Sequence, residues 1–496
     1  MAITNGPLLN SVPAPGKQTL SSNYLDFTGT TDTTWAQQYL PDLMEKEAEV
    51  FGPRTIAGFL SKIGAEEAMA ADQVVWSEQG RLHLSYKGKT ASTTTLLIQG
   101  DIDEATYHAS GIITGASGKM GIRVNDTVII ANSVEVVKAI VTVVNADTIT
   151  IAPYGATTIT HGSGTNADKD CTILVYGSEY GKGKRYLEDD GSTASDSRDA
   201  NEPQFKSFSN KPIIIKDYYE VSGSDTSRIG WVEVTGEEGQ SGYLWYLKAE
   251  ADTRARFTDY LEMAMIEGIS GTPGSSTADN IVNGAGNSFG TEGLFAAIES
   301  RGNETSGVTG VNAATDLAEF DAILAEFDKQ GAIEENMLFV NRATSLAIDD
   351  MLAAMNSYGA GGTSYGVFEN DEDMALNLGF SGFRRGSYDF YKSDFRYLND
   401  LATRGGINAA NAAEAVRGVI IPAGTSTVYD QQLGKNLKRP FLHVRYRASQ
   451  TDNRRMKTWT TGSVGAATSA LDAMQIHFLS ERCLVTQGAN NFMIMK

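Results

Sequence analysis

Two segments of the sequence have the spacing of a nucleophilic serine site. Residues 286–290 and 362–366 each match Gly-x-Ser-x-Gly, a pattern in which a strained turn between a strand and a helix exposes the serine. Neither segment has a strand pattern before it and a helical pattern after it. Because glycine takes 51 of the 496 positions, such matches arise by chance. The sequence therefore indicates no catalytic serine.

Phosphate and metal chemistry are not indicated either. Residues 177–184 resemble a phosphate-binding loop, but they have one residue too few between the glycines and a glycine where serine or threonine must hold magnesium. The five histidines are scattered, and the acidic clusters at 188–190 and 369–373 lack the alternating spacing of a calcium loop. We expect no catalytic residue, no metal site and no cofactor, and hence a protein that is not an enzyme.

Positive charge is concentrated between residues 435 and 457, which hold eight basic residues and one acid in a chain of net charge −20. His443, Arg445 and Arg447 alternate with apolar neighbours, so they share one face of a strand. Three interpretations stay open: a solvated strand face, a contact with an acidic protein surface, or a contact with nucleic acid. The candidate contact residues of this basic strip are Lys435, Lys438, Arg439, Arg445, Arg447, Arg454 and Arg455.

The opposite charge is concentrated at residues 186–202, which carry six acids and one base. Complementary charge selects and orients protein partners. We therefore hypothesise that this acidic link of one subunit contacts the basic strip of a neighbouring subunit. Its candidate residues are Glu188, Asp189, Asp190, Asp196 and Asp199.

The element that must position these surfaces is the longest helical pattern of the chain, residues 242–268. About one residue in three is charged, which excludes a membrane span. Apolar residues recur at helical spacing, so one side is expected to be buried. The expected buried side holds Leu244, Leu247, Ala251, Phe257, Leu261, Ala264 and Met265. The expected polar side holds Lys248, Glu250, Asp252, Arg256, Asp259 and Glu262.

Before this helix the hydrophobic period changes to two. Residues 74–88 read as a strand that leaves the main body, and its return partner is expected at 211–221 and 231–234. Between the two limbs, short apolar strands and close turns predict a small antiparallel barrel at 92–178, which should fold by itself. The sequence thus predicts a two-stranded projection with a β domain nested inside it.

After the helix a second body is expected. Residues 317–327 and 346–355 have helical patterns on either side of a short buried strand at 337–340. Further strands are expected near 380–391 and 418–421, and the chain closes with a strand-rich tail. The fold class is therefore α+β.

Composition bounds the function. The net charge of −20 argues against general nucleic-acid binding or attachment to an anionic membrane, because both need basic surface. Two cysteines cannot form a disulfide framework, and the N-terminal sequence has no secretory pattern. We expect synthesis in the cytoplasm.

The order of these elements resembles a known family. An N-terminal arm, a long two-stranded loop, a long helix, a helix-strand-helix body and a closing strand tail resemble the major capsid protein of tailed bacteriophages, which has the HK-ninety-seven-type fold. The run at 470–496 and the size of the chain are similar to coat proteins of crAss-like phages. The resemblance implies an α+β capsid fold with N-arm, E-loop, spine helix, peripheral and axial domains, plus an inserted all-β domain.

The resemblance also implies a division of the chain. The implied segments are 1–70 as N-terminal arm and short helices, 71–91 and 179–235 as extended E-loop strands, 92–178 as the inserted small β-barrel domain, 236–314 as the peripheral domain with its spine helix at 242–268, 315–460 as the axial domain, and 461–496 as returning peripheral-domain strands.

The implied function is structural. Many copies would assemble as pentamers and hexamers into the icosahedral shell that encloses phage double-stranded DNA, together with scaffold, portal and auxiliary capsid proteins. The location would be the virion capsid after synthesis in the host cytoplasm, with non-specific proximity to packaged DNA and no membrane partner. Two alternatives stay open: another shell-forming protein of the same fold, such as a nanocompartment, and a multidomain enzyme with a β accessory domain.

Overall fold

The computed structural model covers the 496-residue chain and divides it into two units. Unit 1 comprises residues 1–76 and 208–496, and unit 2 comprises residues 77–207. The structure describes residues 66–102, 108–115, 120–155, 158–161, 169–182, 205–226, 233–235, 241–271, 290–356, 382–423, 425–430, 435–463 and 468–496.

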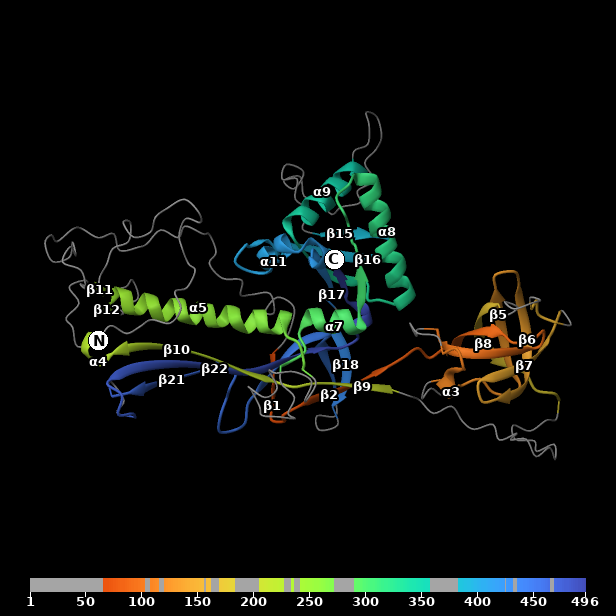
Figure 1. The fold of residues 1–496 in the computed structure, drawn as a ribbon, viewed down its shortest axis with the longest axis horizontal. Coiled ribbons are helices and arrows are strands. Elements are labelled where there is room, and N and C mark those ends of the chain that lie inside the picture. Colours follow the sequence, from red (N-terminus) through yellow and green to blue (C-terminus); the bar gives the residue numbers. More distant parts are fainter. Residues whose placement is uncertain are drawn as a thin grey trace. The chain divides into compact units, whose positions relative to one another are not determined.

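Unit 1 contains a five-stranded sheet built on its longest strand. The antiparallel pairing of β10 with β22 runs from Ile213 opposite Arg482 to Ser222 opposite Ala473. Figure 1 shows α5 lying along these strands. The sheet contains β1 (Glu66–Met69), β10 (Ile213–Ser222), β20 (Leu442–Arg447), β21 (Lys457–Gly462) and β22 (Ala473–Thr486), and the helix is α5 (Leu244–Glu267).

Two sequence expectations about pairing are wrong here. Residues 213–222 pair with β22, and not with the strand that leaves at residue 74. The partner of β2 (Val74–Gln79) is β9 (Phe205–Asn210), and the chain enters and leaves unit 2 along these two strands. The segment expected at 231–234 contributes instead to a hairpin before α5, formed by β11 (Glu233–Thr235) and β12 (Ser241–Tyr243).

The end of the expected helical arm is also different. Residues 66–69 form β1, which runs parallel to β20. These residues form an edge strand and not a helix because both glutamates of the strand make ion pairs with arginines. Glu67 pairs with Arg445, and Glu66 pairs with Arg455. The rest of the expected arm lies outside the described residues.

The buried stripe of α5 follows a spacing of four residues. Thr253, Phe257, Leu261 and Met265 are all buried. Phe257 and Leu261 pack on Ile476, Phe478 and Ile215 of the sheet, with 5.9 Å between the ring centroids of Phe257 and Phe478. The apolar spacing of the sequence therefore corresponds to a real contact face.

Two residues of this helix are on the side opposite to expectation. Ala251 is exposed because it lies six residues before Phe257, which at about 100° per residue places it about 120° from the buried stripe. Glu262 is buried, beside the sheet arginine Arg482, whose charge it stabilises. The side chains of Leu244, Leu247 and Lys248 lie outside the described residues.

Unit 1 also contains a second, six-stranded sheet, in the order β13-β23-β17-β14-β16-β15. Asn312 caps α8 by accepting a hydrogen bond from the Thr315 amide, and Gly331 ends that helix in the left-handed conformation. The elements are α8 (Ala313–Gln330), α9 (Arg342–Asn356), β13 (Asn303–Thr305), β14 (Glu335–Val340), β15 (Gly382–Arg385), β16 (Tyr388–Asp394), β17 (Gly418–Pro422) and β23 (Met493–Met495). The closing tail is thus split, with β22 in the first sheet and β23 in the second.

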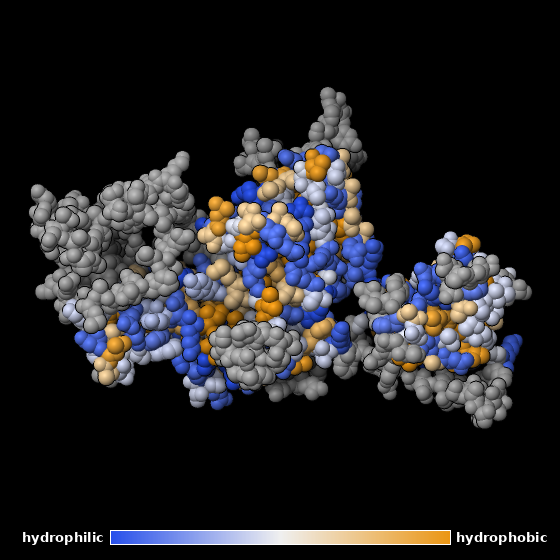
Figure 2. Space-filling model, in the orientation of Figure 1, coloured by the Kyte–Doolittle hydropathy of each residue, from blue (hydrophilic) through white to orange (hydrophobic). Residues whose placement is uncertain are grey.

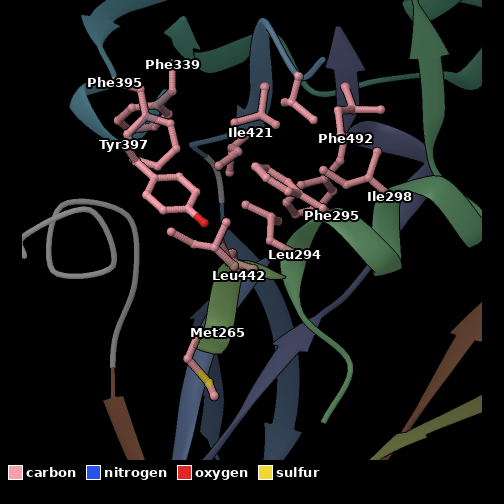
Figure 3. Close-up of a cluster of buried hydrophobic side chains, with 14 of the residues drawn as sticks. Met265, Leu294, Phe295, Ile298, Phe339, Phe395, Tyr397, Ile421, Leu442 and Phe492 are labelled. Carbon is pink, nitrogen blue, oxygen red and sulfur yellow. The ribbon is translucent and has the colours of Figure 1, made fainter. Parts of the chain in front are cut away.

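A shared core joins the two sheets of unit 1. Figure 3 shows Leu294, Phe295 and Ile298 of α7 facing Phe492 and Ile421, with Phe339, Phe395 and Tyr397 nearby. Leu442 and Leu484 of the first sheet belong to the same cluster. The remaining elements of the unit are α4 (Gly223–Thr226), α7 (Leu294–Arg301), α10 (Arg396–Asn399), α11 (Arg404–Ala410), η3 (Ala412–Glu414), β18 (Thr425–Asp430), β19 (Lys435–Pro440) and η4 (Ala489–Asn491).

Unit 2 contains a closed barrel in the order β3-β4-β7-β6-β5-β8. It begins at residue 85, and not at the expected residue 92, because β3 pairs with both β4 and β8. Tyr86 of β3 is buried in the barrel core, and its hydroxyl accepts a hydrogen bond from the Gly121 amide. The elements are α3 (Ile112–Gly115), β3 (Ser85–Thr90), β4 (Thr95–Asp101), β5 (Asp126–Asn132), β6 (Val136–Asn145), β7 (Thr148–Pro153) and β8 (Asp170–Ser178).

The buried stripe of α5 gives a first prediction. Leu261→Asp should lower the stability of unit 1 by at least about 3 kcal/mol, because it buries a carboxylate without a partner. Tyr260→Asp, one residue earlier on the half-exposed side, is the matched control and should change stability little. Chemical denaturation followed by circular dichroism measures both, and equal effects of the two variants would contradict the assigned face.

The barrel gives a second prediction. A fragment of residues 81–182 should unfold in one cooperative transition, because all six strands and the core are present. A fragment of residues 92–178 lacks β3, which leaves one edge of β4 and one edge of β8 unpaired, and it should show no cooperative transition. Thermal melts followed by circular dichroism compare the two. A cooperative melt of the shorter fragment would show that β3 is dispensable.

Candidate interaction surface

The structure describes part of the basic strip and none of the acidic link that we expect to contact it. The acidic candidates Glu188, Asp189, Asp190, Asp196 and Asp199 lie outside the described residues. Lys435, Lys438 and Arg439 belong to β19, which pairs with β18, but their side chains are not described. Arg445, Arg447, Arg454 and Arg455 are described, and all four meet carboxylates of their own chain.

The two arginines of β20 pair with acids of the edge strand β1 and of the turn that follows it. Arg445 lies opposite Glu67 in the pairing of β20 with β1, and its Nη2 is 2.8 Å from Glu67 Oε2. Arg447 donates a hydrogen bond to Asp72, which raises the pKa of the guanidinium, and lies 3.8 Å from Glu481. The side chain of Arg445 is only 15% exposed, so a purely solvated strand face is excluded for it.

The turn after β20 adds two more arginines. Arg454 Nε is 2.8 Å from Glu481 Oε2, and Arg455 pairs with Glu66. Glu66 also lies 3.5 Å from Arg482, a buried residue of β22. Burial lowers the pKa of Arg482, while Glu66 and Glu262 favour its charged form. Glu66 and Glu262 therefore both compensate Arg482, the most deeply buried positive charge of this group.

These residues form three neighbouring groups of ion pairs on the first sheet, which we together call the arginine cluster. It comprises Arg445, Arg447, Arg454, Arg455 and Arg482, with the acids Glu66, Glu67, Asp72, Glu262 and Glu481. Three of these acids come from β1 and the turn after it, so the cluster holds the N-terminal strand on the sheet. The contact of the basic strip with an acidic link of another subunit stays a prediction.

Sequence reasoning found the arginines but not their partners. Glu66 and Glu67 sit in a segment with a helical pattern, and Glu481 and Arg482 sit inside an apolar tail. One signal was available. A charged Glu-Arg pair inside an otherwise apolar strand must be compensated if it is buried, which points to oppositely charged residues elsewhere in the chain.

A second polar contact anchors the end of α5. The Tyr397 hydroxyl donates to Glu267 Oε1 at 2.8 Å, and Arg404 Nη1 donates to Glu267 Oε2 at 2.9 Å. Arg404 also lies over the Phe295 ring, 5.8 Å from its centroid. Burial raises the pKa of Tyr397 strongly, and the Glu267 charge raises it further. Glu267 thus ties the end of α5 to α10 and α11, which connect β16 with β17 of the second sheet.

Other chemistry is limited in the described part of the chain. No group of histidines, cysteines, aspartates and glutamates there could hold a metal ion. Among the same residues, no helix has the length and apolarity needed to cross a membrane. Cys171 and Cys483 are buried, and burial raises the pKa of each thiol to about 12, which makes both poor nucleophiles. Segment 362–366 and most of segment 286–290 lie outside the described residues.

Comparison with known proteins gives structural similarity only. No protein-family model matches the sequence, and no curated protein does. A solved structure of Microbacterium phage Oxtober96 is 9% identical, with 93% of this chain and 97% of that chain covered and a TM-score of 0.38. The mature capsid of bacteriophage PhiM1 is 11% identical, with 62% and 78% covered and a TM-score of 0.31. The capsid of cyanophage P-SCSP1u is 9% identical, with 65% and 80% covered and a TM-score of 0.32.

The arginine cluster gives a third prediction. Glu66→Gln should destabilise unit 1 by about 1 to 3 kcal/mol, because it leaves the buried Arg482 without its carboxylate from β1. Asp72→Asn is the matched control, since Asp72 is 91% exposed and should matter little. Denaturant titration measures stability, and hydrogen exchange of residues 66–69 reports the release of β1. Equal protection of these amides in both variants and the wild type would contradict the anchoring role of Glu66.

The contact of Tyr397 gives a fourth prediction, on pH. Folding raises the pKa of the Tyr397 phenol above the ordinary tyrosine value of about 10, at which the unfolded chain releases this proton. The stability that Tyr397 contributes is therefore complete below about pH 10 and is lost as the pH rises toward the raised folded pKa.

Tyr397→Phe removes this titration, so the stability of the variant should fall less steeply above about pH 10 than that of the wild type. Tyr260→Phe, at a half-exposed position, is the control and should keep the wild-type slope. Denaturation curves recorded between neutral and alkaline pH give the slopes. Parallel curves for Tyr397→Phe and the wild type would contradict the assignment.

Proposed function

We propose that this chain is a major capsid protein of a tailed bacteriophage, which self-assembles into an icosahedral shell around double-stranded DNA. The observation that carries the proposal is the arrangement of unit 1. A 24-residue helix lies along an antiparallel sheet, a β domain is inserted in the chain before that helix, and a helix-strand-helix body follows it. The elements follow one another in the order that the capsid fold requires.

The parts of the fold take capsid roles in this proposal. Helix α5 with the first sheet is the spine helix and peripheral domain, and α8, α9 and the second sheet are the axial domain. The strands β2 and β9 are the base of the E-loop, and the barrel is its inserted domain. The N-arm role, expected for residues 1–70, falls almost entirely on residues outside the described part of the chain. The role is structural, and no chemical step is assigned to the chain.

Exposed apolar side chains on unit 1 favour self-association. Leu401 is 79% exposed, Val311 70% and Ile407 56%, and Figure 2 shows hydrophobic residues among hydrophilic ones on the surface of this unit. Covering apolar surface is favourable by about 25 cal/mol per Å². Contacts between copies in pentamers and hexamers would supply that cover.

Other partners follow from the capsid role. Scaffold, portal and auxiliary capsid proteins would bind the shell, and packaged DNA would lie near it without strong attraction, since the chain carries a net charge of −20. The protein would be made in the host cytoplasm and reside in the virion. A crAss-like origin stays a prediction from the sequence.

Electron microscopy of the purified protein, alone and after co-expression with a scaffold, tests the proposal. Closed shells of uniform size are expected. A monomer that stays dispersed under both conditions would contradict a shell-forming role. Shells that form around a cargo enzyme and exclude DNA would favour a nanocompartment over a phage capsid.

The proposed inter-subunit charge contact gives a fifth prediction. Asp189→Lys with Asp190→Lys should impair assembly, and adding Lys438→Glu with Arg439→Glu should partly restore it. The second pair of changes avoids Arg454 and Arg455, which already meet Glu481 and Glu66. Light scattering at low and high salt measures assembly, and the wild-type rate should fall as salt screens the contact. No restoration, together with an assembly rate that is insensitive to salt, would contradict the contact.

A further inference from the structure

A hollow of about 530 Å³ opens on the barrel of unit 2. It is formed where β5, β6 and the ends of β7 and β8 come together. Two tyrosines at its rim, Tyr154 and Tyr176, are each 50% exposed. Its lining includes Thr127, Lys138, Tyr154, Tyr176, Ser178 and Glu179. Aromatic rings and hydrogen-bonding groups therefore meet at one place on the barrel.

A β-bulge gives the hollow its shape. In the pairing of β5 with β8, Thr127 lies opposite Gly177 and Val128 lies opposite Val175, so Tyr176 is an extra residue in its strand. A bulge of this kind re-aims a side chain and interrupts the ladder locally. Gly177 keeps the space beside it free, since a Cβ atom there would lie 3.3 Å from Thr127 Oγ1. The backbone thus presents Tyr176 beside an open space.

Hydrogen bonds fix two polar residues of the hollow, and other polar side chains of its lining can still bind a ligand. The Tyr154 hydroxyl donates a hydrogen bond to Glu179 Oε2, which raises the pKa of Tyr154 to about 12 and keeps this donor protonated. The Glu179 amide donates to the Asn125 carbonyl at 3.0 Å, which fixes the start of that side chain. Lys138 and Tyr176 make no side-chain hydrogen bond or ion pair with the residues that the structure describes.

We propose that this hollow binds a saccharide. A sugar ring presents a face of C–H groups, which packs on a half-exposed tyrosine ring, and a rim of hydroxyls, which need both donors and acceptors. Glu179 accepts from sugar hydroxyls, and Lys138 and Ser178 supply donors, with the charged groups making the stronger bonds. The site goes beyond the shell-forming role and does not depend on it.

A nucleic acid fits the same groups less well. Stacking on tyrosine would suit a base, but strong binding needs several cations along the phosphates. Among the residues that the structure describes, Lys138 is the only lysine or arginine that lines the hollow, and Glu179 lies in the same lining. The balance of one cation and one anion matches a neutral ligand rich in hydroxyls.

Saturation-transfer NMR on the full chain tests the proposal. The probes are methyl glycosides of glucose, galactose, mannose and N-acetylglucosamine, and a thymidine oligonucleotide serves as the competing ligand class. At least one glycoside should give saturation transfer and bind with a dissociation constant in the millimolar range, which is typical of an open site that contacts one ring. Transfer to none of the four glycosides, or to the oligonucleotide alone, would overturn the proposal.

Variants locate the binding. Tyr176→Ala should weaken binding of the glycoside at least about tenfold, because it removes a stacking surface. Glu179→Gln should weaken it less, since it keeps a neutral acceptor. Leu174→Ala is the matched control, because Leu174 is a 38% exposed residue of the same strand that does not line the hollow. Thermal melts show that each variant is folded. Unchanged affinity in a folded Tyr176→Ala protein would overturn the assignment.

Discussion

The structure of unit 1 depends on pairing both edges of one buried strand, β22, and on covering its apolar side chains. A buried strand must pair its backbone groups on both sides, and β22 does so with β10 on one edge and with β20 and β21 on the other. On the face that these two residues share, Phe478 packs against α5 and Leu484 enters the core that joins the two sheets. Segments far apart in sequence therefore reach their final positions only when this late strand is in place.

Buried charge is the second constraint, and it acts on the same strand. Arg482 lies inside the sheet, where an uncompensated guanidinium would cost several kcal/mol. Glu66 comes from β1 and Glu262 comes from α5, so one arginine requires acids from two distant elements. This dependence explains why a short parallel strand is held at the edge of the sheet although its Ala68 side chain is exposed and adds no apolar burial.

The sequence predicts most elements of this fold but fewer of their partners. The helix expected at 242–268 is α5, and the strand expected at 337–340 lies within β14, because apolar periodicity reports the local face directly. Pairing is not local. The isoleucines of β10 fit any apolar strand, so nothing in residues 213–222 selects β22 over β2. The acids of the arginine cluster could not be predicted for the same reason, namely that ion pairing between distant segments leaves no local pattern. Glu66, for example, is more than 370 residues from Arg455.

The barrel of unit 2 differs from unit 1 because its hydrophobic core is formed by residues of the barrel itself and of the segments between its strands. Among the described residues, its buried cluster lies between Leu84 and Val175, and its six strands close into a ring. The bulge in β8 is accommodated within this closed ring of paired strands. Since Val175 on one side of Tyr176 packs against the core, the bulge frees the tyrosine without removing an anchor. Closure of the barrel is thus what allows its outer surface to be shaped around a hollow.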